Sequence, residues 1–118
     1  MTNNGKLSTR GQVLLWAAQR ASAAVLAVCV LVHLVTIIYA VRHGLSATEI
    51  LGRTRGNAAW AGFYSLFVLA VAVHAPIGLR SFLAETLNWR GTGLDVAMMA
   101  LALTLTMWGL RAVLAVFV

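Results

Sequence analysis

The sequence predicts an all-α integral membrane protein in which three transmembrane helices form part of a helical bundle. Hydrophobic residues make up 61% of the 118 residues and charged residues only 10%, whereas a soluble domain carries about 25% charged residues. The mean hydropathy is +0.87. Three apolar runs are separated by short polar segments, and each is long enough to cross the hydrocarbon core, which takes about 20 residues. We therefore expect a single membrane domain over residues 1–118.

The first span is expected at about residues 20–41. Between Ala21 and Val41 the only strongly polar side chain is His33, and a helix of this length covers about 30 Å. Apolar residues continue from Gln12 into Arg20 without a break. We therefore expect the helix to begin at the membrane surface, before the span itself.

The second span is expected at about residues 58–80, after a polar loop over residues 42–57. Within this loop Ser46 and Glu49 have the spacing of a capping box, which predicts the start of a short surface helix. The second span contains His74 and ends at Arg80. Its helix is expected to continue along the interface to Leu87.

The third span is expected at about residues 94–117, after a turn over residues 88–93. Its one basic residue, Arg111, lies seven residues from the end of the chain. A long cationic side chain near a helix end can extend to the interface. Arg111 is therefore interpreted as an interfacial anchor.

The Lys and Arg residues lie at the ends of the apolar runs, which does not fit the clustered basic face of a nucleic-acid-binding protein. Five flank one side of the predicted membrane, and three or four flank the other. This bias predicts a multi-pass protein of the cell inner membrane with its N-terminus in the cytoplasm. The five are Lys6, Arg10, Arg20, Arg80 and Arg90, and the others are Arg42, Arg53, Arg55 and, near them, Arg111.

Two histidines, His33 and His74, lie inside the first and second spans. An unpaired ring nitrogen in hydrocarbon is costly, so each needs a partner. Neutral imidazole is a usual axial ligand of haem iron, and a haem can be held between helices by one histidine from each. Each histidine is therefore either a haem ligand or a hydrogen-bonded packing residue. His43, in the loop, is expected to be a surface residue.

The depths of the two histidines decide whether they could share one iron. His33 lies thirteen residues from Arg20, about 20 Å, whereas His74 lies six residues from Arg80, about 9 Å from the same surface. The axial ligands of one iron must be level to within a few ångströms. We predict that the two histidines do not share a haem, and that each would need a histidine from another subunit or a second copy.

His74 is followed by a glycine four residues on, an arginine six on and an acid eleven on, which are Gly78, Arg80 and Glu85. This pattern resembles the second-helix signature of the membrane-anchor cytochrome b subunit of succinate dehydrogenase and fumarate reductase. Arg20 and the hydroxyl residue Ser22 are similar to the start of the first span in that family. The sequence departs from the family at three positions nearby, where Trp16 replaces a serine, Gln19 a histidine and Ala23 a glycine.

The resemblance implies that His74 is an axial ligand of haem b. It places Arg20 near the haem propionates and the quinone, with Ser22 and Trp16 as further quinone contacts, and Arg80 at the charged edge of the cofactor. Because members with two haems have a second ligand in the first helix, it also implies that His33 could hold a second haem. One haem or two, shared with a partner subunit, both agree with this pattern.

The function implied by the resemblance is that of a haem b-containing anchor carrying electrons between an iron–sulfur subunit and membrane quinone. With one cysteine and no glycine-rich dinucleotide loop, the chain cannot oxidise succinate alone. The expected partners are a flavoprotein subunit, an iron–sulfur subunit, a second anchor subunit and the lipid bilayer. The alternatives are a haem-free structural or assembly subunit, and an anchor of another cytochrome b-type respiratory complex, which would be expected to have more spans.

Overall fold

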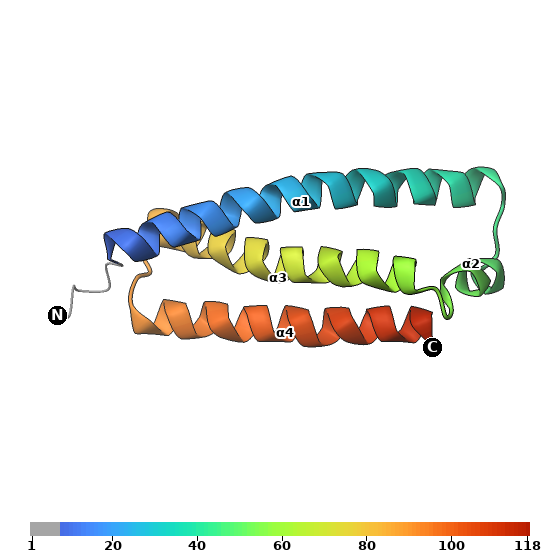
Figure 1. Cartoon of the computed structure of the whole chain (residues 1–118). Coiled ribbons are helices and arrows are strands. Elements are labelled where there is room, and N and C mark those ends of the chain that lie inside the picture. Colours follow the sequence, from blue (N-terminus) through green and yellow to red (C-terminus); the bar gives the residue numbers. More distant parts are fainter. Residues whose placement is uncertain (1–7) are drawn as a thin grey trace.

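The computed structural model describes residues 8–118, and its long helices run up, down and up (Figure 1). These are α1 (Thr9–Arg42), α3 (Ala58–Thr86) and α4 (Thr92–Phe117), with a short helix α2 (Ala47–Thr54) between the first two. All three long helices are long and apolar enough to cross a membrane. The predicted fold class is confirmed.

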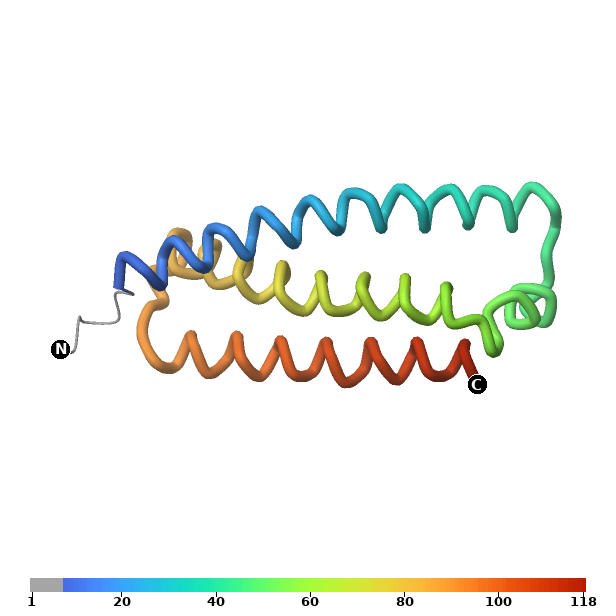
Figure 2. The backbone as a smooth tube through the Cα atoms, in the orientation of Figure 1, coloured from blue at the N-terminus to red at the C-terminus, as the bar shows by residue number. Residues whose placement is uncertain are grey.

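The long helices lie side by side, and α3 packs against both α1 and α4. Figure 2 shows the start of α1 near the turn between α3 and α4, while α2 and the C-terminus lie at the opposite end. We call these the Arg80 end and the α2 end. The molecule measures 57 × 24 × 23 Å, so it extends beyond a hydrocarbon core of about 30 Å. Lys6, used above to predict the orientation, lies outside the described residues.

Helix α1 begins eleven residues before the predicted span, because nothing in the sequence breaks the helix there. Ser8 caps its first turn by accepting a hydrogen bond from the backbone N–H of Gly11 at 3.2 Å. The helix ends at Arg42, and Gly44 then takes a positive φ of 60° in the turn toward α2. A left-handed conformation of this kind favours glycine.

Helix α2 begins with the predicted capping box, which is confirmed. The Ser46 hydroxyl accepts from the Glu49 backbone N–H, and the Glu49 carboxylate accepts from the Ser46 backbone N–H. These bonds from Ser46 hold the pKa of Glu49 below its usual value. The cap is therefore intact near neutral pH and weakens as the pH falls through the pKa of Glu49. Thr54 ties the helix to α4 by donating to the Val116 carbonyl at 2.9 Å.

Small residues form the contacts between the long helices. The buried residues of α3 are Ala70, Ala72 and Pro76, and α3 runs through this proline as one helix. Many large apolar side chains instead point outward, such as Leu103, which is 66% exposed. Association of helices in lipid depends on close packing of small residues. The bundle therefore buries small side chains between its helices and keeps many large apolar side chains on its outer surface.

Helices α3 and α4 approach each other closely at Gly109. A Cβ atom built on Gly109 would overlap the side chain of Val68 on α3, whose own Cβ would lie 3.2 Å away. Val68 cannot readily give way, because a β-branched side chain is stiff at χ1. Gly109 therefore sets the spacing of these two helices.

We expect Gly109→Ala to destabilise the protein, although alanine is the better helix former. The overlap with Val68 should cost about 1–3 kcal/mol, as overpacking usually does, against a gain of about 1 kcal/mol in helix propensity. Gly62→Ala is the matched control, because no atom lies within 4 Å of the added Cβ there. Thermal unfolding in detergent should show a lower midpoint for the first variant and no loss for the second. Equal effects of the two changes would contradict the close packing.

Candidate functional site

His74 on α3 faces Ser22 on α1. Its Nδ1 atom lies 3.3 Å from the Ser22 hydroxyl oxygen. The same hydroxyl donates a hydrogen bond to the Gln19 carbonyl, one turn earlier in α1, at 3.0 Å. Ser22 is 7% exposed, whereas the His74 ring is half-buried. Among the described residues, Ser22 is therefore the one that links His74 to α1 by a hydrogen bond.

The other ring nitrogen of His74, Nε2, has no hydrogen-bond partner among residues 8–118. The ring is half-buried, and an imidazole nitrogen can bind a metal when its lone pair is free. The part of the chain that the structure describes has no group of three or more His, Cys, Asp or Glu side chains that could hold a metal ion. A metal bound to His74 would therefore take its further ligands from elsewhere.

Gln19 and Gly78 lie against each other between α1 and α3, next to His74. A Cβ atom on Gly78 would be 3.1 Å from the Gln19 side-chain nitrogen. The Gln19 side-chain oxygen, Oε1, is buried and has no hydrogen-bond partner in the described chain. Such an unsatisfied acceptor costs about 1–3 kcal/mol. The site therefore contains an acceptor that a bound ligand with an O–H or N–H group would satisfy.

A polar pocket of about 290 Å³ opens beside Gln19 at the Arg80 end. Its lining residues come from the first part of α1 and the last part of α3. They are Gln12, Leu15, Trp16, Gln19, Ile77, Arg80 and Ser81. A volume near 300 Å³ is at the small end of ligand sites. The pocket is large enough for the head of a small aromatic ligand.

Arg80 and Arg20 are the two arginines that lie beside this pocket. Arg80 donates from Nε to the Asp95 carboxylate on α4 at 2.8 Å, the one ion pair recorded among residues 8–118. The two side chains are 22% and 48% exposed, so the pair adds at most about 1 kcal/mol to stability. Arg20 stacks on the ring of Trp16 at 5.6 Å from the ring centroid.

Of the predicted quinone residues, Trp16 lines the polar pocket, Arg20 lies on Trp16, and Ser22 is directed to His74. Gln19, Ser81 and Asp95 are not among the residues that the sequence pattern indicated. Asp95 had a signal, because it is the only acid in the third apolar run and follows Arg80 across a short turn. The sequence pattern marks Gln19 only as a position where the family that it resembles has a histidine, and the unsatisfied oxygen is visible only in three dimensions.

His33 lies in a different environment, toward the α2 end. Its Nδ1 atom is 3.2 Å from the Tyr64 hydroxyl. The ring packs edge to face against Tyr64 and Phe67, with centroid distances of 5.6 and 5.8 Å. Eleven residues of α1 separate His33 from Ser22, which is about 16 Å along the helix. Because His74 is level with Ser22, the two imidazoles are too far apart to be axial ligands of one iron.

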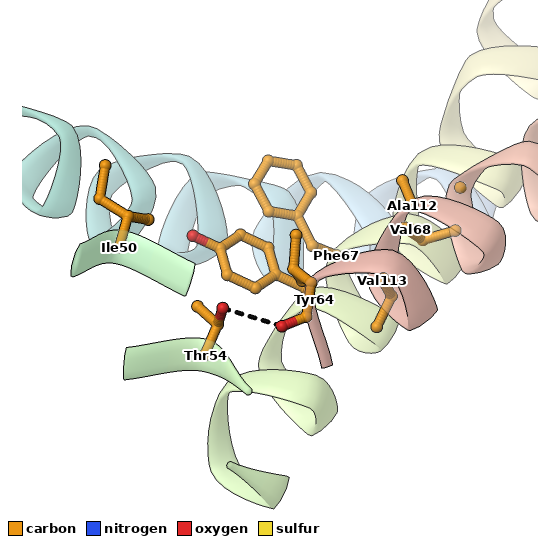
Figure 3. A pocket seen from close by; sticks show the side chains of 9 residues that line it. Ile50, Thr54, Tyr64, Phe67, Val68, Ala112 and Val113 are labelled. Atoms are coloured by element: carbon orange, nitrogen blue, oxygen red, sulfur yellow. Dashed lines mark hydrogen bonds between the residues drawn. The ribbon is translucent and has the colours of Figure 1, made fainter. Parts of the chain in front are cut away.

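The rings beside His33 also line an apolar pocket of about 290 Å³ at the α2 end. Figure 3 shows Thr54, Tyr64 and Phe67 around this pocket, with Ala112 and Val113 of α4 on its other side. The dashed line marks the bond from Thr54 to the Val116 carbonyl. The pocket has few polar groups.

The third histidine, His43, is an exposed residue, as predicted. Its ring stacks on Tyr39 at a centroid distance of 4.2 Å. Its Nδ1–H donates to the Tyr39 carbonyl at 2.9 Å. These contacts lie within the last turn of α1, so they close the helix end.

Comparison with known protein families gives one match over nearly the whole chain. The model of the succinate dehydrogenase/fumarate reductase transmembrane subunit family matches residues 3–116. No curated protein and no solved structure matches the chain significantly. The matched region includes α1, α3, all of α4 except its last residue, and the residues described above.

Proposed function

The chain belongs to the succinate dehydrogenase/fumarate reductase transmembrane subunit family, and we propose that it anchors such a complex through a haem b held by His74 and a quinone bound at the Arg80 end. Its role as a membrane anchor follows from the family and from the three apolar helices. The haem, the quinone site and the orientation in the membrane are proposals. The match to this family also makes another cytochrome b-type complex the weaker alternative.

The observation that carries the proposal is the state of the His74 ring. One nitrogen is held by Ser22 at 3.3 Å, and the other has no partner within residues 8–118. An imidazole arranged in this way at membrane depth could hold haem iron. The second ligand would come from the second anchor subunit, because His33 is too far along the bundle.

When bound, haem b supplies reversible one-electron transfer beside the quinone site. The residues of this chain have three tasks toward it. His74 would hold the iron, Arg20 and Arg80 would neutralise the propionate carboxylates, and the packing of α1 on α3 keeps water from the ring. Arginine suits the second task because charge-assisted hydrogen bonds to carboxylates are strong.

The proposed quinone site is the polar pocket beside Trp16 and Gln19. Trp16 offers an aromatic face, and the unsatisfied Gln19 oxygen would accept a hydrogen bond from a hydroxyl of the reduced quinone. Arg20 lies on Trp16 and adds positive charge. Ser22 as a direct quinone contact stays a prediction.

We propose that the Arg80 end faces the cytoplasm, where the iron–sulfur subunit and the flavoprotein subunit would dock. The support is the bias of Lys and Arg toward this end and the position of the polar pocket there. Electrons would then enter the membrane at the end where both redox sites lie. A second anchor polypeptide would cover the outward face of His74.

The first test of this function is the ratio of haem b to covalently bound flavin in the purified complex. A ratio near one supports His74 as the only haem ligand in this chain. A ratio near two would assign a second haem to His33. A ratio near zero would leave a haem-free structural anchor, which is the main alternative.

We expect His74→Ala to remove or severely weaken one b-type haem, because no other described side chain of this site can replace the lost nitrogen. His33→Ala should remove a second haem only in a complex that contains two. His43→Ala is the control, since this exposed ring contacts only its own helix. The measurement is the haem absorption band per complex. Unchanged haem content in His74→Ala would refute the assignment.

We expect Gln19→Leu to raise KM for a short-chain quinol, used as the electron donor for fumarate reduction, by about three- to tenfold, because the variant loses the acceptor of one neutral hydrogen bond. Electron transfer from succinate to a phenazine acceptor, which bypasses the membrane site, should not change. Thr104→Val is the matched control, because this hydroxyl bonds only the Ala100 carbonyl of its own helix. If Gln19→Leu and Thr104→Val give the same KM, the quinone does not use this amide.

A further inference from the structure

We infer that Ser22 is a positioning residue that fixes the tautomer of His74, placing the ring proton on Nδ1 and leaving the Nε2 lone pair free for iron. The inference rests on the proposed role of His74 and assigns Ser22 a task other than the quinone contact predicted from the sequence. Its basis is the chain of contacts from the Gln19 carbonyl through the Ser22 hydroxyl to His74 Nδ1.

The direction of these bonds follows from counting protons. A serine hydroxyl has one proton to donate and two lone pairs to accept with. The Gln19 carbonyl can only accept, and it lies 3.0 Å from the Ser22 oxygen. When the hydroxyl proton is given to this carbonyl, the contact of 3.3 Å to His74 requires the ring to donate from Nδ1–H. Neutral imidazole carries one proton, so Nε2 is then a bare acceptor.

The reverse direction of the bond between Ser22 and His74 would leave an N–H group without an acceptor. If Ser22 donated to Nδ1, the ring proton would lie on Nε2, which has no acceptor within residues 8–118. An N–H group without an acceptor in a dry environment is rarely tolerated. A bare Nε2 lone pair, in contrast, is satisfied by a metal. The hydrogen bonds around Ser22 favour the proton on Nδ1. Binding of iron by Nε2 favours it as well, because Nε2 must then carry no proton.

Three threonine hydroxyls inside the long helices lack this connection to a histidine ring. Thr36, Thr104 and Thr106 each donate to a carbonyl of their own helix and reach no ring nitrogen. Bonds of this kind are common for Ser and Thr in helices. The Ser22 hydroxyl, on a residue that is only 7% exposed, also reaches a ring nitrogen of α3. Its role therefore differs from ordinary bonding within a helix.

A hydrogen bond from Nδ1–H also makes the ring a stronger ligand. Partners of this kind fix the orientation of a ligating histidine and raise its basicity, and their loss usually costs 10- to 100-fold in affinity. A serine oxygen is a neutral acceptor, so we expect the effect on haem affinity to be near the lower limit, about tenfold. The stronger donor favours ferric iron, and its loss should raise the midpoint potential of the haem.

The first experiment measures the tautomer without haem. The full chain with ¹⁵N-labelled histidine rings is placed in lipid nanodiscs, and NMR reports which ring nitrogen of His74 carries the proton. Wild type and Ser22→Thr, which keeps the hydroxyl, should have the proton on Nδ1. Ser22→Ala should shift the population toward Nε2–H, and Thr106→Val should not. Equal tautomer populations in wild type and Ser22→Ala would overturn the inference.

The second experiment measures the haem midpoint potential and the haem retained by the complex. Ser22→Ala should raise the potential and weaken haem retention about tenfold, and Ser22→Thr should restore both. If Ser22→Ala does not assemble, Ser22→Cys replaces it, because a thiol is a weaker acceptor of similar size and should raise the potential in the same direction. An unchanged potential in the assembled variant would overturn the inference.

The two experiments separate failure of the inference from failure of the proposed function. A complex that keeps its haem in His74→Ala refutes the function, and the NMR result still decides the tautomer. A complex that loses its haem in His74→Ala but is indifferent to the residue at position 22 refutes the inference alone.

Discussion

Close packing of α3 against both neighbours is the interaction on which the rest of this structure depends. In lipid, apolar side chains gain little by contact with each other, so helices associate where small residues let their backbones approach. Gly109 provides this on α4, and Ala70, Ala72 and Pro76 provide it on α3. The short distance between α1 and α3 then brings a hydroxyl as short as that of serine within reach of a histidine on the other helix.

The polar groups inside the bundle are few and lie at separate levels of the α1–α3 contact. Ser22 with His74 forms one level, and His33 with Tyr64 forms the other, nearer the α2 end. Both use a hydroxyl on one helix to satisfy an imidazole on the other, as a membrane interior demands. They differ in surroundings, because aromatic rings surround His33, whereas the His74 level adjoins a polar pocket and two arginines.

The large exposed apolar surface has a direct consequence for assembly. Leu31 and Val35 on α1 and Met99 on α4 are each more than 60% exposed. Lipid covers such side chains well, and so does a neighbouring transmembrane subunit. If the half-buried ring of His74 is to hold a haem, a neighbouring subunit must cover it, because a lipid chain offers no second ligand for the iron.

The sequence by itself determined the three apolar helices, the capping box at Ser46 and the order of the histidines along the helices, because hydropathy, local capping and helical rise depend only on neighbours in the chain. The family resemblance came from the spacing of residues around His74. The tertiary structure decided what each polar group touches. The contact of Ser22 with His74, the pairing of Arg80 with Asp95 and the unsatisfied oxygen of Gln19 all join or adjoin different helices. Their geometry is set by how the helices rotate and approach, and no local pattern in the chain encodes it.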